Sequence, residues 1–132
     1  MCLVEATYFI KDGSPLLGAT CQAGQSDKIG VEALVWIPDT DSGKKFSAWV
    51  RIQKPDGVQV DIATPERQVS PGMETFTFGN WRTPIPLGNW KIINTQIVDQ
   101  FGNVPCEGNV YGDACPNLTI SAAAPVCNFE VT

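Results

Sequence analysis

Apolar and polar residues alternate with a period of two along most of this chain. The clearest example is the segment 29–37, in which every second residue is apolar: Ile29, Val31, Ala33, Val35 and Ile37. Successive side chains of a β-strand point to opposite faces, so this pattern predicts strands with one buried face. No stretch of ten residues free of Gly and Pro has the spacing of an amphipathic helix. The pattern therefore predicts an all-β protein.

The alternating segments predict seven or eight short strands in a single domain that spans residues 1–132. We expect strands over residues 2–10, 16–21, 29–37, 46–53, 58–62, 74–78, 90–98 and 118–122, with 126–131 continuing the last one. Gly and Pro fall between these segments, as turn residues do. This spacing is typical of an antiparallel sandwich or barrel. We expect one shared core that contains Val31, Val35, Phe46, Val50, Trp90 and Ile92.

Composition narrows the function classes. The chain is 43% hydrophobic and 17% charged, which is typical of a globular protein. Its net charge is −5, and its densest basic cluster is Lys44-Lys45, so we expect no nucleic-acid partner. The absence of histidine removes catalysis and metal binding by imidazole. No apolar run approaches the roughly 18 residues of a membrane span. We expect no cofactor and no enzymatic activity.

Two turn motifs carry a resemblance to a known superfamily. Leu87-Gly88-Asn89-Trp90 precedes an alternating strand, and Asp99-Gln100-Phe101-Gly102-Asn103 follows it. This arrangement resembles bacterial and archaeal immunoglobulin-like domains, in which Gly-x-aromatic opens the penultimate strand and Asp-x-x-Gly-Asn leads into the last. The resemblance covers residues 29–132. It implies an antiparallel immunoglobulin-like β-sandwich, and it says little about function.

The two motifs also have a direct physical interpretation. Gly88 permits a tight turn, and Trp90 supplies a large core side chain. Asp99 can accept hydrogen bonds from the turn backbone, while Gly102 can adopt a positive φ. The interval from Trp90 to Asp99 is one residue longer than in the usual pattern, so we expect a β-bulge near Ile93-Asn94. The cysteine-containing loop before the last strand is an insertion.

The five cysteines predict disulfide bonds. Cys106 and Cys115 bracket a short loop rich in Gly, Asn and Asp, and we expect them to be joined. The alternative is a set of reduced, buried thiols in a cytosolic protein. The resemblance implies that the second half of the first strand runs parallel to the last strand, which favours a Cys21–Cys127 bond. Cys2 is then the odd cysteine, free or available for an intermolecular bond.

The first strand also has a candidate role in assembly. Residues 11–15, Lys-Asp-Gly-Ser-Pro, form a hinge-like turn after residues 1–10. These ten residues are therefore a candidate detachable strand that could pair with the open sheet edge of another copy. Such exchange would build a fibre, which a bond through Cys2 could lock.

Several polar motifs are candidate sites. Asp39 and Asp41 have the alternate spacing of calcium ligands, but the downstream Glu of an EF-hand is missing and ordinary turn chemistry is the favoured explanation. Asn117-Leu118-Thr119 is an N-glycosylation sequon. The acid pairs of a glycosidase could be Asp56 with Asp61, or Glu107 with Asp113, but exposed carboxylates are the common alternative.

Trp36 and Trp49 fall on the polar faces of their predicted strands. Three explanations remain open: a loop, 64–73 or 79–88, covers them; they contact a protein; or they form a flat platform on adjacent strands for sugar rings. Trp81, in a loop with nearby prolines, is expected to anchor that loop.

These observations lead to one main hypothesis. We expect an extracellular, non-enzymatic structural or adhesion domain, which could be a fibre subunit that binds copies of itself. The alternative is a carbohydrate-binding module that uses the exposed tryptophans. A third hypothesis is a small secreted hydrolase or inhibitor.

Overall fold

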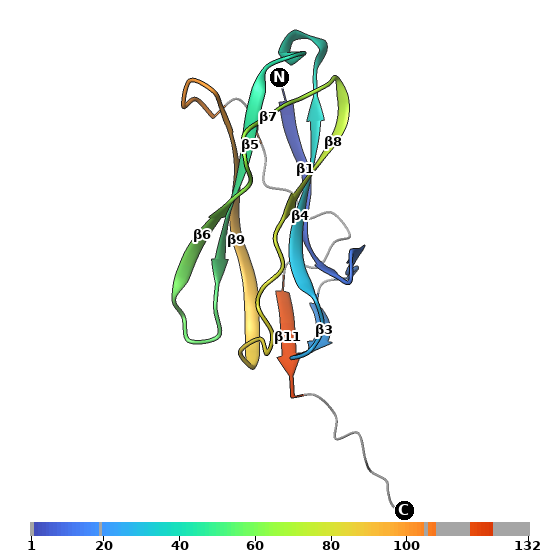
Figure 1. Ribbon diagram of the computed structural model, residues 1–132, viewed down its shortest axis with the longest axis vertical. Helices are drawn as coiled ribbons and strands as arrows, with labels where there is room; N and C mark the ends of the chain where they lie inside the picture. The colour runs from blue at the N-terminus through green and yellow to red at the C-terminus, as the bar shows by residue number, and fades with distance from the viewer. Residues whose placement is uncertain (1, 19, 105, 108–116, 123–132) are drawn as a thin grey trace, which may run out of the picture.

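The computed structural model describes residues 2–18, 20–104, 106–107 and 117–122, and these form two β-sheets with a shared core between them (Figure 1). The described residues contain eleven strands and one short 3-10 helix. The predicted all-β class and the two sheets are confirmed, whereas the expected purely antiparallel arrangement is corrected, because each sheet also contains a parallel pair of strands.

The first sheet is built around the N-terminal strand. Its path runs β10 (Cys106–Glu107), β1 (Cys2–Lys11), β4 (Ile29–Ile37) and β8 (Gly72–Phe78), and β2 (Ser14–Pro15) pairs with the end of β1. The β1–β4 and β4–β8 pairs are antiparallel, whereas β10 runs parallel to β1. The N-terminal strand is therefore part of its own chain's sheet.

The second sheet contains the longest strand. Its path runs β3 (Thr20–Gly24), β11 (Asn117–Ser121), β9 (Gly88–Asp99), β5 (Lys45–Gln53) and β6 (Gln59–Ala63), and β7 (Arg67–Gln68) also pairs with β5. β3 runs parallel to β11, as the resemblance implied. The 3-10 helix η1 (Asp39–Asp41) joins β4 to β5. Among the described residues, no helix has the length and hydrophobicity that a membrane crossing requires.

The predicted strands agree closely with the observed ones. Seven of the eight strands of five or more residues match the expected segments, and the bounds of β4 are identical to those expected. The eighth, β3, begins four residues later than the expected segment 16–21 and shares only two residues with it. Three observed strands were not expected: β2, β7 and β10. Each has only two residues, which is too short for an alternating pattern to be recognised. The expected continuation at 126–131 lies outside the described residues.

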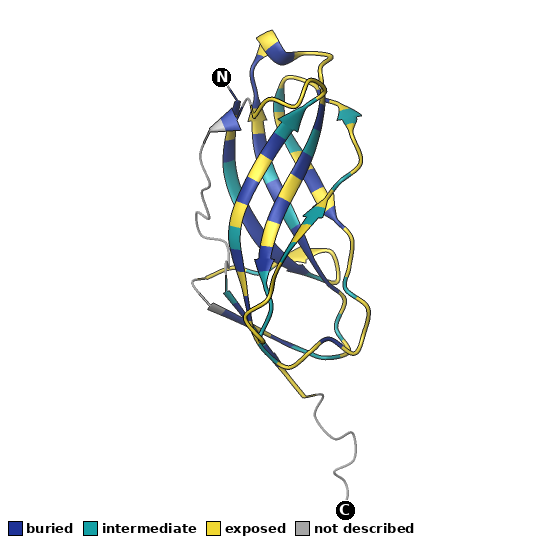
Figure 2. Cartoon of the chain, turned by 90° about the vertical axis from the view of Figure 1, so that its left-hand side faces the viewer, coloured by how far each residue is buried: buried dark blue, intermediate teal, exposed yellow. Residues whose placement is uncertain are grey.

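The core lies between the sheets and has the composition expected. All six residues predicted to share a core belong to one buried cluster. These residues could be predicted because buried and exposed positions alternate along the strands, as Figure 2 shows. Trp81 packs against this cluster with its ring centroid 5.4 Å from that of Trp90, which confirms that it anchors its loop. The Trp90 indole N–H donates to the Pro86 carbonyl oxygen at 3.0 Å.

One polar contact crosses the core. The hydroxyl oxygens of Thr7 on β1 and Thr95 on β9 lie 2.9 Å apart, and both residues are buried. A buried hydroxyl without a partner would destabilise the fold, so each satisfies the other. The contact therefore links the two sheets through the apolar core.

The turn after β9 has the expected chemistry. One Asp99 carboxylate oxygen accepts hydrogen bonds from the backbone N–H groups of Phe101 and Asn103, each at 2.9 Å. Gly102 has a φ of +86°, as expected. At the other end of β9, Gly88 has a φ of +117°, and a Cβ there would lie 2.8 Å from Pro55 Cβ. Only glycine fits that position without displacing the β5–β6 turn.

The disulfide of Cys106 differs from the expected one. Cys106 is bonded to Cys2, and their Cα atoms are 4.4 Å apart as parallel neighbours on β10 and β1. The expected Cys106–Cys115 bond is therefore corrected, and so is the role of Cys2 as the odd cysteine. The short loop between Cys106 and Cys115 suggested a local bond. The pairing of β10 with β1 instead places Cys2, which is distant in the sequence, directly beside Cys106.

The second expected bond concerns Cys21. Cys21 lies on β3 opposite Leu118 of β11 and is disulfide-bonded. Cys115 and Cys127 both lie outside the described residues. The Cys21–Cys127 pairing therefore stays a prediction, and peptide mapping without reduction would test it.

Candidate functional site

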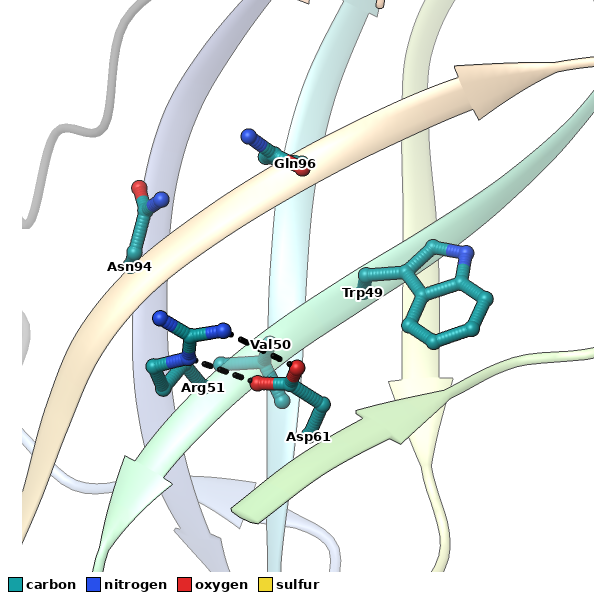
Figure 3. A pocket seen from close by; sticks show the side chains of 6 residues that line it. All are labelled: Trp49, Val50, Arg51, Asp61, Asn94 and Gln96. Atoms are coloured by element: carbon teal, nitrogen blue, oxygen red, sulfur yellow. Dashed lines mark hydrogen bonds and ion pairs between the residues drawn. The ribbon is translucent and has the colours of Figure 1, made fainter. Parts of the chain in front are cut away.

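A polar pocket lies on the outer face of the second sheet. Its volume is about 130 Å³, and Figure 3 shows the six side chains that line it: Trp49, Val50, Arg51, Asp61, Asn94 and Gln96. Neighbouring strands supply them in register, since Trp49 pairs with Gln96 and Arg51 pairs with both Asn94 and Asp61. The pocket is thus a direct product of strand register.

A β-bulge gives the pocket two of its polar groups. Arg51 pairs with Asn94 while the next residue, Ile52, pairs with Ile92, so Ile93 is the extra residue. This confirms the bulge expected near Ile93-Asn94. The extra residue reverses the alternation of β9, and Asn94 and Gln96 therefore face outward. Without the bulge, a strict alternation from Trp90 would turn these two amides into the core.

The charges of the pocket form a matched pair. The Arg51 guanidinium donates two hydrogen bonds to Asp61, with N–O distances of 2.8 and 3.1 Å. The hydrogen bond from Arg51 holds the pKa of Asp61 below its ordinary value, and Asp61 raises the pKa of Arg51 in return. Both groups therefore stay charged at neutral pH. Beside them, the Trp49 indole is 43% exposed.

A second pocket lies further along the same face. Its volume is about 470 Å³, and it is lined by Gln53, Lys54, Pro55, Asn89, Lys91, Asn117 and Thr119. Trp49, Arg51 and Gln53 are successive outward positions of β5, so the two pockets follow one strand. At roughly 3.4 Å per residue, Trp49 and Gln53 are about 14 Å apart along the strand. Together the pockets form an elongated polar surface.

The outer face of the first sheet has a different character. Leu3 pairs with Trp36, and Trp36 pairs with Met73, so these side chains form a row across β1, β4 and β8. They are 40%, 40% and 55% exposed. We call them the Leu3–Trp36–Met73 row. Exposed apolar side chains that are contiguous in this way are typical of interaction surfaces.

Further along the first sheet, beyond the Ala6–Leu34 pair, Tyr8 has a specific polar partner. Its hydroxyl donates to a Glu32 carboxylate oxygen at 3.0 Å, and Thr77 donates to the other oxygen at 3.2 Å. Burial is the main cause that raises the pKa of Tyr8, and the bond to Glu32 and its charge add to it, giving a pKa of about 12. Tyr8 therefore stays neutral at physiological pH.

Trp36 and Trp49 are exposed, but they do not share a face. Their exposed fractions exclude the alternative in which loop 64–73 or 79–88 covers them. Trp36 lies on the first sheet and Trp49 on the second, so the expected platform on adjacent strands is wrong. Alternation within a strand does not show which sheet the strand belongs to, because that depends on pairing between distant segments.

The calcium candidates are not assembled into a ligand group. The Asp41 carboxylate forms an ion pair with Lys44 at 2.7 Å, and Asp41 is buried. Asp39 is exposed on the same 3-10 turn. Among the described residues, no three acidic or cysteine side chains are grouped as metal ligands would be.

The proposed glycosidase acids and the sequon asparagine do not form a catalytic pair or a shared cluster among the described residues. Asp56 accepts a hydrogen bond from the Val58 backbone N–H within its turn, whereas Asp61 pairs with Arg51, so each acid has its own partner. Asn117 of the sequon begins β11 and lines the second pocket. The Glu107 side chain and Asp113 lie outside the described residues.

Several residues of these surfaces were missed from the sequence. Arg51 and Gln53 share the outward alternation of Trp49, and this pattern could have identified them. Asn94 and Gln96 could have been found by carrying the predicted bulge through to the residues after it. Leu3 and Met73 carried no such signal, because their contact with Trp36 depends on strand pairing between distant segments.

Comparison with known proteins adds no assignment. No protein-family model matches the chain, and no curated protein matches it.

Proposed function

We propose that the protein is an extracellular, non-enzymatic structural or adhesion domain with an immunoglobulin-like arrangement of its two sheets. The observation that supports this proposal most directly is the Leu3–Trp36–Met73 row, an exposed apolar surface on three paired strands. Large apolar side chains that are contiguous on a sheet face are favourable protein contacts. The partner we propose is a second copy of the chain.

Two features support the immunoglobulin-like arrangement. β3 runs parallel to the last described strand, β11, while β1 belongs to the opposite sheet. The resemblance implied this parallel pairing with the last strand. The turn residues Gly88 and Asp99 also have the expected roles. The Cys2–Cys106 bond supports an oxidising, extracellular location.

Light scattering after size-exclusion chromatography tests the proposed self-contact. We expect a mass that rises with protein concentration, and a Trp36→Arg variant that stays monomeric. Trp49→Arg, on the other sheet, is the matched control and should associate like the parent protein. A concentration-independent monomer would contradict this proposal.

The edges of the sheets are relevant to fibre assembly. β10 pairs with β1 only at Cys2 and Leu3, and β2 pairs only at Ile10 and Lys11. Exchange of residues 1–10 between copies would have to break the β1–β4 pairs and the Cys2–Cys106 bond. We therefore propose assembly through the intact face rather than through a detached first strand.

A second candidate function is supported by the pocket at Trp49. An exposed indole can stack on the apolar face of a sugar ring, and Arg51, Asp61, Asn94 and Gln96 offer donors and acceptors to its hydroxyl groups. This combination favours a carbohydrate-binding module.

A glycan panel tests this second function. Saturable binding that Trp49→Ala abolishes and Trp36→Ala preserves would support it. Binding that depends on Trp36 instead, or the absence of binding across the panel, would contradict it.

A further inference from the structure

We infer that the two pockets of the second sheet form one site for a linear acidic oligosaccharide whose carboxylate groups contact Lys54 and Lys91. This inference rests on the proposed carbohydrate-binding function and specifies its ligand class. It follows from the alignment of the pockets, their polar groups and their charge.

The alignment indicates an extended ligand. The first pocket, about 130 Å³, is too small to enclose a ligand of ordinary size, which typically needs about 300–1,000 Å³. The second pocket, about 470 Å³, lies within that range. Since Trp49, Arg51 and Gln53 connect them on one strand, a chain of sugar rings can contact both pockets along β5.

The polar groups match a polyhydroxyl chain. Each sugar hydroxyl both donates and accepts a hydrogen bond, and amide side chains do the same. Gln53, Asn89 and Asn117 line the second pocket, in the same manner as Asn94 and Gln96 line the first. Within the second pocket, the Thr119 hydroxyl donates to the Asn89 side-chain oxygen at 2.9 Å. Amide groups therefore occur along the whole proposed path.

The charge selects an acidic ligand. Lys54 and Lys91 both line the second pocket, and no acidic residue is among the described residues that line it. Neither lysine forms an ion pair within the described part of the chain, whereas Arg51 of the first pocket is balanced by Asp61. The protein as a whole carries a net charge of −5. A local excess of positive charge on an acidic protein complements a carboxylate-bearing ligand.

The test uses matched charged and neutral probes. Isothermal titration would compare oligogalacturonate and oligomannuronate with their methyl esters, which keep the sugar chain and remove the charge. The protein would be produced without glycosylation, because Asn117 lines the site. We expect each acidic chain to bind about tenfold more tightly than its ester, with this preference lost at high salt.

Three variants separate the two proposals. Lys54→Gln with Lys91→Gln should remove the acidic preference, so that acid and ester bind with equal affinity, and Trp49→Ala should weaken the binding of both probes. Lys45→Gln is the matched control, since Lys45 lies at the opposite end of β5 and lines neither pocket. Unchanged melting temperatures would show that the variants fold.

Each remaining outcome has a definite meaning. Equal binding of acid and ester would overturn the inference and leave the carbohydrate function standing. Binding of acid that Trp49→Ala does not alter would overturn the single continuous site. Binding of neither probe type, or tighter binding of an oligoglutamate peptide, would overturn the inference, while the glycan panel decides the carbohydrate function separately.

Discussion

Trp90 shows how a single residue contributes to this fold. Its ring is only 2% exposed, lies against Trp81, and its N–H is satisfied by Pro86. Removing a buried aromatic side chain leaves a cavity, so we expect Trp90→Ala to lower the free energy of unfolding by about 3–5 kcal/mol. Urea denaturation measures this. A loss below about 1 kcal/mol would show that the ring is not in the core.

Tyr8 provides a prediction about pH. Its folded pKa of about 12 lies above the ordinary value of 10.0, because burial and Glu32 both disfavour the phenolate. Its contribution to stability is therefore complete below pH 10 and is lost as the pH rises through about 12. The chain has one other tyrosine, Tyr111.

An ultraviolet absorbance titration of the native protein tests this pKa. We expect a tyrosine transition near pH 12 that Tyr8→Phe removes. If Tyr8→Phe retains that transition, the assignment to Tyr8 is contradicted.

At the scale of elements, the sequence predicted the strands well because one face of each is buried. Alternation alone located β4, and the motif spacing located the bulge in β9. The division of strands between sheets could not be read in this way, because it depends on pairing between segments far apart in the chain. The misplaced Trp36–Trp49 platform and the missed Leu3–Trp36–Met73 row share this cause.

The Cys2–Cys106 disulfide is another feature of long-range pairing. It joins β1 to β10 across a sequence separation of 104 residues, and a closed loop of that length restricts the unfolded chain strongly. The loop-entropy model gives a stabilisation of about 4.7 kcal/mol for such a loop. We expect Cys2→Ser with Cys106→Ser to lower the free energy of unfolding by about that amount.

Guanidinium denaturation of this double variant measures the loss. Peptide mapping of the parent protein without reduction is the accompanying control and should recover Cys2 and Cys106 in one linked fragment. A Cys106–Cys115 fragment instead would contradict the pairing.

At the scale of the whole molecule, the two sheets present outer faces of different chemistry. The first sheet exposes the apolar Leu3–Trp36–Met73 row, and the second exposes two polar pockets beside Trp49. The two surfaces belong to different sheets (Figure 1), so under the proposed function one copy could contact a second copy and a saccharide at the same time. This division of contacts between faces is the central claim of the proposed function.

Amide chemical-shift mapping by NMR tests this division most directly. On addition of oligogalacturonate, we expect the largest shift changes along β5 and β9, at Trp49, Arg51, Lys91 and Asn94, with the amides of Leu3, Trp36 and Met73 unaffected. Shift changes centred on the Leu3–Trp36–Met73 row, or no changes at saturating ligand, would contradict it.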